Sequence, residues 1–137
     1  MMNWELSNKN DFLIPKTTND PLAVKKLILP SNDGLLIIPE NEINFVRSDN
    51  IYAYIHNGKE KYFTTSALKE IESLLDPNLF FRCHRSYIVN LNSIIKIVKH
   101  QNCYLILSNG SEIPVSRNKK KDLIDLVVQA ENHVTLD

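Results

Sequence analysis

Short apolar runs separated by turn residues dominate the chain from position 27 to position 63. The pair Asp33-Gly34 lies between two such runs, and an Asp-Gly pair in that position indicates a β-hairpin. Asn57-Gly58 separates two further runs and suits a type I′ turn, in which both central residues need a positive φ. Strands are therefore predicted at 27–29, 35–38, 43–47, 51–56 and 59–63.

Two later segments have apolar residues at helical spacing. The first is 64–75, where one of the residues 64–66 can cap the start and Asp76-Pro77 ends the helix. The second runs from a cap at Ser116 to about Gln129. Its apolar stripe consists of Leu123, Leu126, Val127 and Ala130. The remaining strands are predicted at 94–98, 104–107 and 111–115, with Asn109-Gly110 as a turn.

Many short strands at regular spacing, together with two helices, predict a mainly β domain. A chain of 137 residues suits a single domain. Residues 1–26 begin with a polar and unpatterned stretch, and we interpret them as an N-terminal extension or arm with Trp4 and Phe12 as apolar anchors. The predicted domain covers 27–130 and is followed by a short tail at 131–137.

Composition narrows the class of protein. Apolar residues make up 43% and charged residues 23% of the chain, as in an ordinary globular protein. No stretch of eighteen apolar residues occurs, so neither a transmembrane helix nor a membrane partner is expected. The N-terminus lacks the basic and apolar regions of a signal peptide. Because only two cysteines are present, a reducing compartment is favoured, and we expect a cytoplasmic protein.

A formal net charge of zero conceals an uneven distribution of charge. The segment 82–121 carries eight basic residues and one acidic residue, whereas the rest of the chain carries eight basic and fifteen acidic residues. A segment at +7 therefore lies beside a remainder at −7. Since the field of exposed charges is screened within about 8–10 Å at moderate salt, the local charge decides which partner is attracted. The alternative for any single charge run is a solvated face.

The most informative stretch is 80–91, with the sequence FFRCHRSYIVNL. Its aromatic residues can be buried, whereas Arg82, His84 and Arg85 cannot all be buried cheaply, so the stretch is expected to present basic side chains outward. The planar fork of an arginine can bond O6 and N7 of guanine together or clamp a phosphate.

A second basic stretch, PVSRNKKK at 114–121, opens the C-terminal helix. The free backbone N–H groups of a helix start attract anions, and here they would lie beside Arg117 and three lysines. Lysines in a first helical turn oppose the helix dipole, and an anionic partner would explain why that cost is tolerated.

These stretches together resemble the LytTR (LytR/AlgR) family of bacterial DNA-binding domains. The resemblance rests on FFRCHRSYIVNL, on GSEIPVSR at 110–117, and on LKEIE at 68–72 and INFV at 43–46. It implies an elongated fold of small antiparallel sheets with one short internal helix and a C-terminal helix. Loops of this fold, instead of a recognition helix, enter successive major grooves of double-stranded DNA. The implied function is sequence-specific DNA binding by a transcriptional regulator.

The resemblance also implies which residues contact DNA. Base contacts fall at Arg85, at Arg117 and, in the loop after the early strand, at about Asn50. In that loop Tyr52 is the alternative to Asn50, and Asp49 would repel phosphate. A second copy of the chain on tandem half-sites is a further expected partner. Phosphate contacts are expected from Arg82, His84, Ser116, Asn118, Lys119, Lys120 and Lys121.

Other chemistries fit the sequence less well. Cys83 and His84 are neighbours on an extended chain and point to opposite faces, so no enzyme is predicted. The cysteines and histidines show no closely spaced ligand pair, and neither a metal nor another cofactor is expected. Cys83 as a thiol sensor, its pKa lowered by basic neighbours, is weighed against a small packed residue, which is favoured. The main alternative function is a protein-interaction module of the same fold that does not bind DNA.

Overall fold

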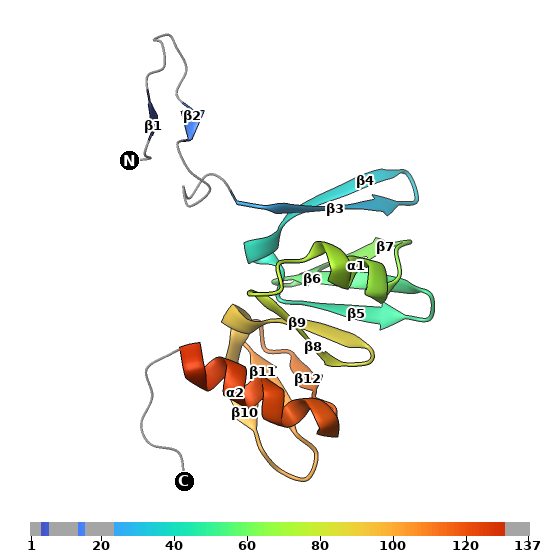
Figure 1. Ribbon diagram of the computed structural model, residues 1–137. Helices are drawn as coiled ribbons and strands as arrows, with labels where there is room; N and C mark the ends of the chain where they lie inside the picture. The colour runs from blue at the N-terminus through green and yellow to red at the C-terminus, as the bar shows by residue number, and fades with distance from the viewer. Residues whose placement is uncertain (1–3, 6–13, 16–23, 131–137) are drawn as a thin grey trace.

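The computed structural model describes residues 4–5, 14–15 and 24–130, and Figure 1 shows their small sheets stacked along one long axis. The strands are β1 (Trp4–Glu5), β2 (Ile14–Pro15), β3 (Lys26–Ser31), β4 (Gly34–Pro39), β5 (Phe45–Asp49), β6 (Tyr52–Asn57), β7 (Glu60–Thr64), β8 (Phe80–His84), β9 (Tyr87–Asn90), β10 (Ile94–Val98), β11 (Tyr104–Leu107) and β12 (Glu112–Pro114). The helices are α1 (Leu68–Leu74) and α2 (Lys120–Ala130), with 3-10 turns η1 (Glu40–Glu42), η2 (Leu91–Ser93) and η3 (Arg117–Lys119).

Five strands form the central sheet in the order β7-β6-β5-β9-β8, and all of its pairings are antiparallel. Successive residues of a strand point to opposite faces, so one strand can serve two cores. Val46 of β5 and Ile88 of β9 are fully buried in one core, whereas their neighbours Phe45 and Val89 are buried in the other. The central sheet therefore joins two hydrophobic layers into one domain.

The first core lies between the central sheet, the β3–β4 hairpin and α1. Its buried residues are Leu27, Leu29, Ile38, Ile43, Val46, Ala53, Ile55, Leu68, Ile71, Leu75, Phe80 and Ile88. The helical spacing predicted the apolar face of α1, whereas in the hairpin, whose sequence consists of continuous apolar runs, only the structure shows which face is buried. Each large side chain fully buried in this way stabilises the fold by about 1.5–3 kcal/mol relative to exposure.

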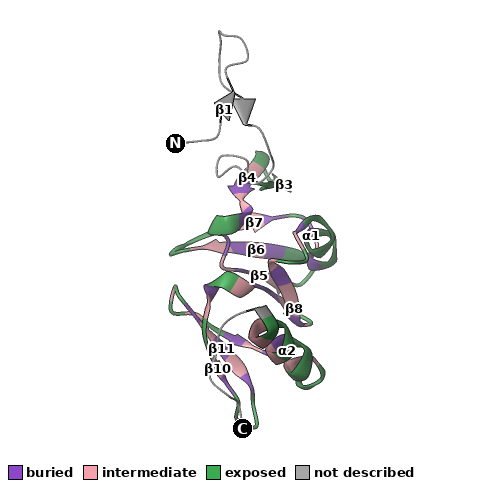
Figure 2. Ribbon diagram, turned by 60° about the vertical axis from the view of Figure 1, so that its left-hand side comes forward, coloured by how far each residue is buried: buried purple, intermediate pink, exposed green. Residues whose placement is uncertain are grey.

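The second core joins the central sheet to α2 and to the three-stranded sheet β10-β11-β12. Its buried residues are Phe45, Cys83, Val89, Cys103, Leu105, Leu107, Ile113, Val115 and Leu123. Figure 2 shows buried segments along the strands, while much of the outer surface of α1 and α2 is exposed. Leu123 is the fully buried residue of the predicted stripe on α2, whereas Leu126 is 39% exposed, so α2 packs along a narrower stripe than predicted.

Two asparagines tie the strands together at the end of the sheet remote from the β8–β9 turn. The amide of the buried Asn90 donates to the carbonyl of Ile43 over 2.8 Å, and its Oδ1 accepts from the N–H of Asn92. Asn44 donates to Ser93 Oγ and accepts from the backbone N–H of Gly58. A buried amide is stable only with such partners, so these contacts also define the register of the connections.

The mainly β architecture with two helices and small antiparallel sheets is confirmed, but two of the three predicted turns differ in detail. Asn32 and Asp33 form the β3–β4 turn, and Gly34 pairs with Ser31 as the first residue of β4. The predicted type I′ turn at Asn57-Gly58 is wrong: Gly58 has a φ of +64°, but Asn57 belongs to β6 and has no positive φ. Glycine at the first central position is typical of type II′ turns. Asn109-Gly110 does form a turn, with Gly110 at a φ of +90°.

Both helices begin later than predicted. Thr64 ends β7, where its hydroxyl donates to the carbonyl of Pro30, and α1 begins at Leu68 after Ala67. Glu70 caps this start by accepting the N–H of Ala67 over 3.1 Å. Ser116 precedes a 3-10 turn in place of α-helix, and its side chain makes no capping hydrogen bond. The sequence pattern located these helices but not their caps, because the sheet contacts of Thr64 compete with a helix start.

Candidate nucleic-acid interface

Three segments that are distant in sequence meet on one edge of the molecule: the β5–β6 turn, the β8–β9 turn and the start of η3. Arg47 of β5 pairs with Tyr87 of β9, so the first two turns lie at the same end of the central sheet. The N–H of Ser48 donates to the carbonyl of Ser86 over 2.9 Å and connects them directly. Figure 1 shows both turns and the start of α2 along the right-hand side.

The β8–β9 turn presents Arg85. The pairing of β8 with β9 shifts register between Arg82 and His84, which is the signature of a bulge at Cys83. Bulges redirect side chains at functional edges. Arg85 and Ser86 form the two-residue turn that follows, and the Arg85 side chain is exposed. The turn thus holds an arginine fork outward, as the sequence predicted.

His84 supports the same turn. Its Nδ1 accepts the backbone N–H of Ser86 over 3.0 Å, so the neutral ring carries its proton on Nε2. Burial lowers the pKa of His84 below its ordinary value, and Arg85 and Arg82 lower it further. Neutral His84 can therefore donate one hydrogen bond from Nε2 to an anion without adding a full charge.

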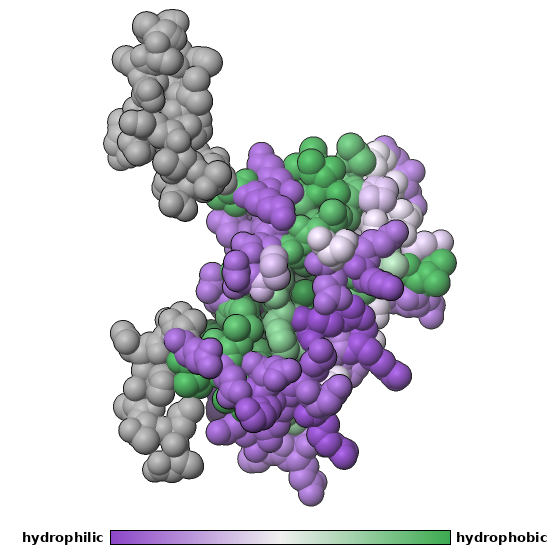
Figure 3. All heavy atoms as spheres, viewed as in Figure 1, coloured by the Kyte–Doolittle hydropathy of each residue, from purple (hydrophilic) through white to green (hydrophobic). Residues whose placement is uncertain are grey.

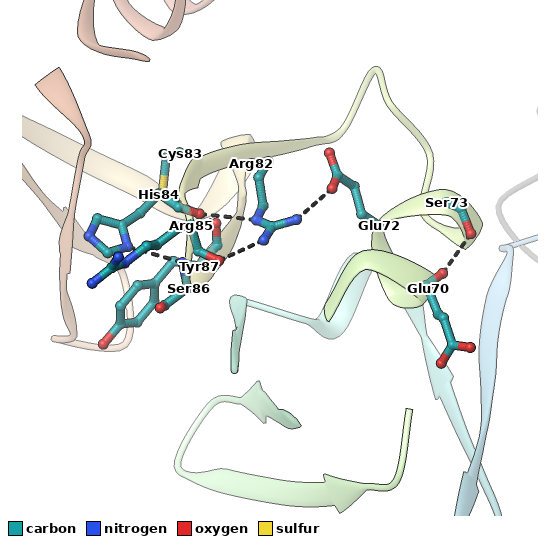
Figure 4. Close-up of polar contacts among 9 residues, drawn as sticks. All are labelled: Glu70, Glu72, Ser73, Arg82, Cys83, His84, Arg85, Ser86 and Tyr87. Carbon is teal, nitrogen blue, oxygen red and sulfur yellow. Dashed lines mark hydrogen bonds and ion pairs between the residues drawn. The ribbon is translucent and has the colours of Figure 1, made fainter. Parts of the chain in front are cut away.

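Arg82 lies differently from Arg85. Its guanidinium donates to the carbonyls of His84 and Arg85 and to the carboxylate of Glu72, and its side chain is 25% exposed. Figure 4 shows Arg82 between α1, which carries Glu72, and the turn. The prediction that Arg82 contacts phosphate stays untested, but these contacts engage each of its three nitrogens with protein.

The third segment is held against β8 by the backbone. The N–H of Ser116 donates to the carbonyl of Cys83 over 2.9 Å, which places Arg117 beside the base of the β8–β9 turn. Arg117 and Asn118 are exposed. One open hollow of about 600 Å³ lies between the turn and this segment. Its lining includes His84, Gln101, Pro114, Ser116, Arg117 and Lys120. Two predicted sites that are distant in sequence therefore share one concave surface.

The three lysines of the third segment have different surroundings. Lys119 is half-buried with its Nζ 6.0 Å from the ring centroid of Phe81, and Lys120 is half-buried in the hollow. Lys121 is exposed and pairs with Asp125 over 3.0 Å. The Asp125 carboxylate raises the pKa of Lys121 through this hydrogen bond.

Asn50 occupies the β5–β6 turn with Ile51 and is exposed. Its φ is +60°, a conformation in which asparagine is enriched, so the turn is one reason for this residue type. The alternative, Tyr52, packs edge-on against Phe63 with ring centroids 5.3 Å apart. Asp49 is exposed beside Asn50.

Lys99 joins this edge although it was not among the predicted contacts. It lines a second hollow of about 510 Å³ together with Arg117, Lys120 and Lys121. In the sequence, Lys99 is marked as a candidate DNA contact only by its position in the segment of charge +7. Figure 3 shows hydrophilic residues gathered over the lower right of the molecule, on the side of the β8–β9 turn and the start of α2.

Cys83 does not have the environment of a reactive thiol. It is fully buried, and its sulfur lies 3.6 Å from the carbonyl of Pro114. Burial raises the pKa of the Cys83 thiol to about 12 and outweighs the lowering effect of Arg82, so the lowered pKa that a thiol sensor requires is absent. Cys103 is also buried, and burial raises its pKa as well. The interpretation of Cys83 as a small packed residue agrees with this environment.

Within the described residues, the histidine, cysteine, aspartate and glutamate side chains form no group of three that could hold a metal ion. In the same part of the chain, every helix is too short or too polar to cross a bilayer.

Comparisons with known proteins agree with this geometry. The LytTr DNA-binding domain family matches residues 33–127. A solved LytTr DNA-binding domain from Bacillus cereus is 28% identical, covers 75% of this chain and 96% of that domain, and superposes with a TM-score of 0.65.

Longer bacterial proteins are also similar. The transcriptional regulatory protein YpdB of Escherichia coli is 32% identical over 102 residues, which are 72% of this chain and 42% of that protein. The transcriptional regulatory protein LytR of Staphylococcus aureus is 33% identical over 93 residues, covering 66% of this chain and 38% of that protein. The chain thus spans less than half the length of these relatives.

Proposed function

Because this chain belongs to the LytTr DNA-binding domain family, we propose that it binds double-stranded DNA at specific sequences and regulates transcription. The observation that carries the proposal is the convergence of three turns on one edge with Arg85 and Arg117 exposed. Such loops can enter a major groove, where each base pair presents a distinct pattern of donors and acceptors. The printed names of YpdB and LytR, transcriptional regulatory proteins, support the regulatory role.

Bases are contacted by Arg85, Arg117 and Asn50 in this proposal. An arginine fork bonds O6 and N7 of guanine together, and an asparagine amide matches N6 and N7 of adenine. Arg117 lines the hollow that contains His84, whereas Arg85 lies in the β8–β9 turn, and we assign the two arginines to different base positions. Replacing either arginine by alanine should cost about 1–3 kcal/mol and relax preference at one position.

Phosphates are contacted by the groups around the arginines. A helical start exposes unpaired N–H groups that favour an anion, and η3 continues directly into α2. Neutral His84 would donate from Nε2. The set consists of His84, Ser116, Asn118, Lys119, Lys120 and Lys121. For Arg82 we propose a different role, developed below.

The rest of the proposal follows from a DNA partner. A DNA-binding regulator works in the bacterial cytoplasm, needs no cofactor and is not an enzyme. A second copy of the chain on an adjacent half-site would raise specificity over competing DNA. Whole relatives are more than twice as long as the matched part, so signals received by other segments lie beyond this proposal.

The test is a gel shift with duplex DNA selected from a random pool, at two salt concentrations. Binding to DNA must weaken steeply as salt rises, because phosphate contacts release counterions. Arg85→Ala and Arg117→Ala should each lose preference at a different base pair. An absence of any shift at low salt would instead favour a protein-interaction module of this fold.

A further inference from the structure

Arg82 links α1 to the turn that presents Arg85. Its Nε donates to the carbonyl of His84 over 3.0 Å, and one terminal nitrogen donates to the carbonyl of Arg85 over 2.6 Å. The other terminal nitrogen donates to Oε1 of Glu72 over 2.7 Å. All three guanidinium nitrogens are thus directed at separate acceptors, as Figure 4 shows.

The two carbonyls lie at the turn end of the β8–β9 hairpin. His84 is the last residue of β8 and pairs with Tyr87 after the register shift, whereas Arg85 lies in the turn and pairs with no residue of β9. A planar fork can bond both neighbouring carbonyls at once. The direction of the Arg85 backbone is thereby fixed by the Arg82 side chain.

Glu72 fixes the direction of the fork itself. It lies on α1, whose residues Leu68 and Ile71 are buried in the first core, so the carboxylate is held by a packed helix. Arg82 and Glu72 line the same hollow of about 420 Å³, which also includes the apolar residues Leu75, Phe80 and Ile88. A charge-assisted contact to a fixed carboxylate prevents the guanidinium from turning toward solvent or toward a phosphate.

We propose that Arg82 is a positioning residue and that Glu72, acting through it, is a determinant of sequence specificity. This inference rests on the proposed function, in which Arg85 contacts a base. The pair adds no contact to DNA. It holds the Arg85 carbonyl, and with it the turn, in the orientation from which the exposed fork reaches one base pair.

If Glu72 acted only through its negative charge, its removal would be expected to strengthen DNA binding and not to weaken specificity. Removing an acidic residue near a DNA-binding edge strengthens attraction to every sequence, since the local field becomes more positive. Loss of the positioning contact instead weakens discrimination at one base pair. Glu72→Gln therefore separates the two effects, and Glu60→Gln is its matched control, because Glu60 is an exposed acid on β7 with the same charge change.

The experiment compares Glu72→Gln, Glu60→Gln, Arg82→Lys and Arg85→Ala on the selected duplex and on its single-base variants. Glu72→Gln should reduce preference at the base pair that Arg85→Ala identifies by about two- to fivefold, the range of a partly exposed ion pair. Its salt dependence should equal that of the wild type. Arg82→Lys should act at the same base pair, because an ammonium cannot span three separated acceptors.

The outcomes are distinguishable. If Arg85→Ala leaves every preference unchanged, the assignment of Arg85 to a base is wrong and the proposed function loses that contact. If Arg85→Ala relaxes one base pair but Glu72→Gln changes no preference, the positioning role is overturned. A smaller salt dependence in an Arg82→Gln variant, which removes the charge, would instead support a phosphate contact for Arg82. Circular dichroism of each variant checks folding, and Glu72→Gln retains Arg82 should the lysine variant fail to fold.

Discussion

His56 lies flat against Phe45, with ring centroids 4.1 Å apart and an interplanar angle of 13°. Burial, together with the nearby charges of Arg47 and Lys61, lowers the pKa of His56 to about 4. The folded protein therefore keeps this ring neutral at pH values where the unfolded chain has already bound a proton. The contribution of neutral His56 to the free energy of unfolding is complete above pH 6.5 and is lost as the pH falls toward 4.

We predict that His56→Gln flattens the acid side of the stability curve. Wild-type unfolding free energy should fall by about 1–2 kcal/mol between pH 6.5 and pH 4 from this residue, a value reduced for the solvent that screens a half-buried ring. Urea unfolding at a series of pH values measures it. His100→Gln, at an exposed position, is the control, and an unchanged slope in His56→Gln would contradict the prediction.

Burial has the opposite effect on a thiol. Since burial raises the pKa of Cys83 to about 12, the folded protein contains almost no Cys83 thiolate near neutral pH. In a Cys103→Ser background we predict that iodoacetamide labels Cys83 at pH 8 roughly a thousandfold more slowly than in denaturant. Mass spectrometry over time follows the reaction. Fast labelling of the folded protein would instead support the hypothesis that Cys83 is a thiol sensor.

At the scale of elements, the start of α2 carries the lysine cluster. Lys121 already pairs with Asp125, whereas the Lys120 side chain lines both hollows beside Arg117. Lysines here contribute to DNA affinity through charge, without sequence preference. Their contributions should differ because their partners within the protein differ.

We predict that the triple change of Lys119, Lys120 and Lys121 to glutamine makes the plot of log affinity against log salt less steep. The slope should become less negative by roughly 0.9 for each phosphate contact removed. Lys121→Gln alone should have the smallest effect of the three single variants. Asp125→Asn should strengthen binding by freeing the Lys121 ammonium. Fluorescence anisotropy from low to moderate salt measures these slopes, and a full slope in the triple variant would exclude the phosphate role.

At the scale of the whole molecule, the charge distribution bears on assembly. A basic edge and an acidic remainder give a neutral total, so two copies bound side by side repel less than two uniformly basic domains. Within the described part of the chain, neither helix presents a dedicated dimer stripe, since α1 uses Leu68 and Ile71 for the first core and α2 uses Leu123 for the second. The neighbouring copy is expected to be contacted through the acidic remainder or through the N-terminal arm, whose Phe12 and Trp4 side chain lie outside the described residues.

We predict that the free chain is a monomer or weak dimer that binds tandem half-sites cooperatively. Sedimentation of the protein alone and titration onto duplexes with one or two half-sites measure this. The second half-site should raise affinity per site, because adjacent copies share contacts. A tight dimer at nanomolar concentration without DNA, or equal affinity per site on both duplexes, would contradict the prediction.

The sequence by itself determined the mainly β class, the hairpins, the two helices and the family. It did so because alternation, helical spacing and turn residues are properties of neighbouring positions, and the motif at 80–91 is contiguous. Arg85 and Arg117 were found in the same way. Both lie in polar stretches of the sequence, and a charged side chain is rarely fully buried without a partner.

Only the tertiary structure decided how these parts meet. The pairing of β9 with β5, the bulge at Cys83 and the contact between Ser116 and Cys83 join residues that no local pattern relates. The surroundings of Arg82 were likewise decided by the tertiary structure. From the sequence, Arg82 is predicted to contact a phosphate. Its guanidinium donates to the carbonyls of His84 and Arg85 and to Glu72 on another element, because a guanidinium binds the acceptors that packing brings within reach.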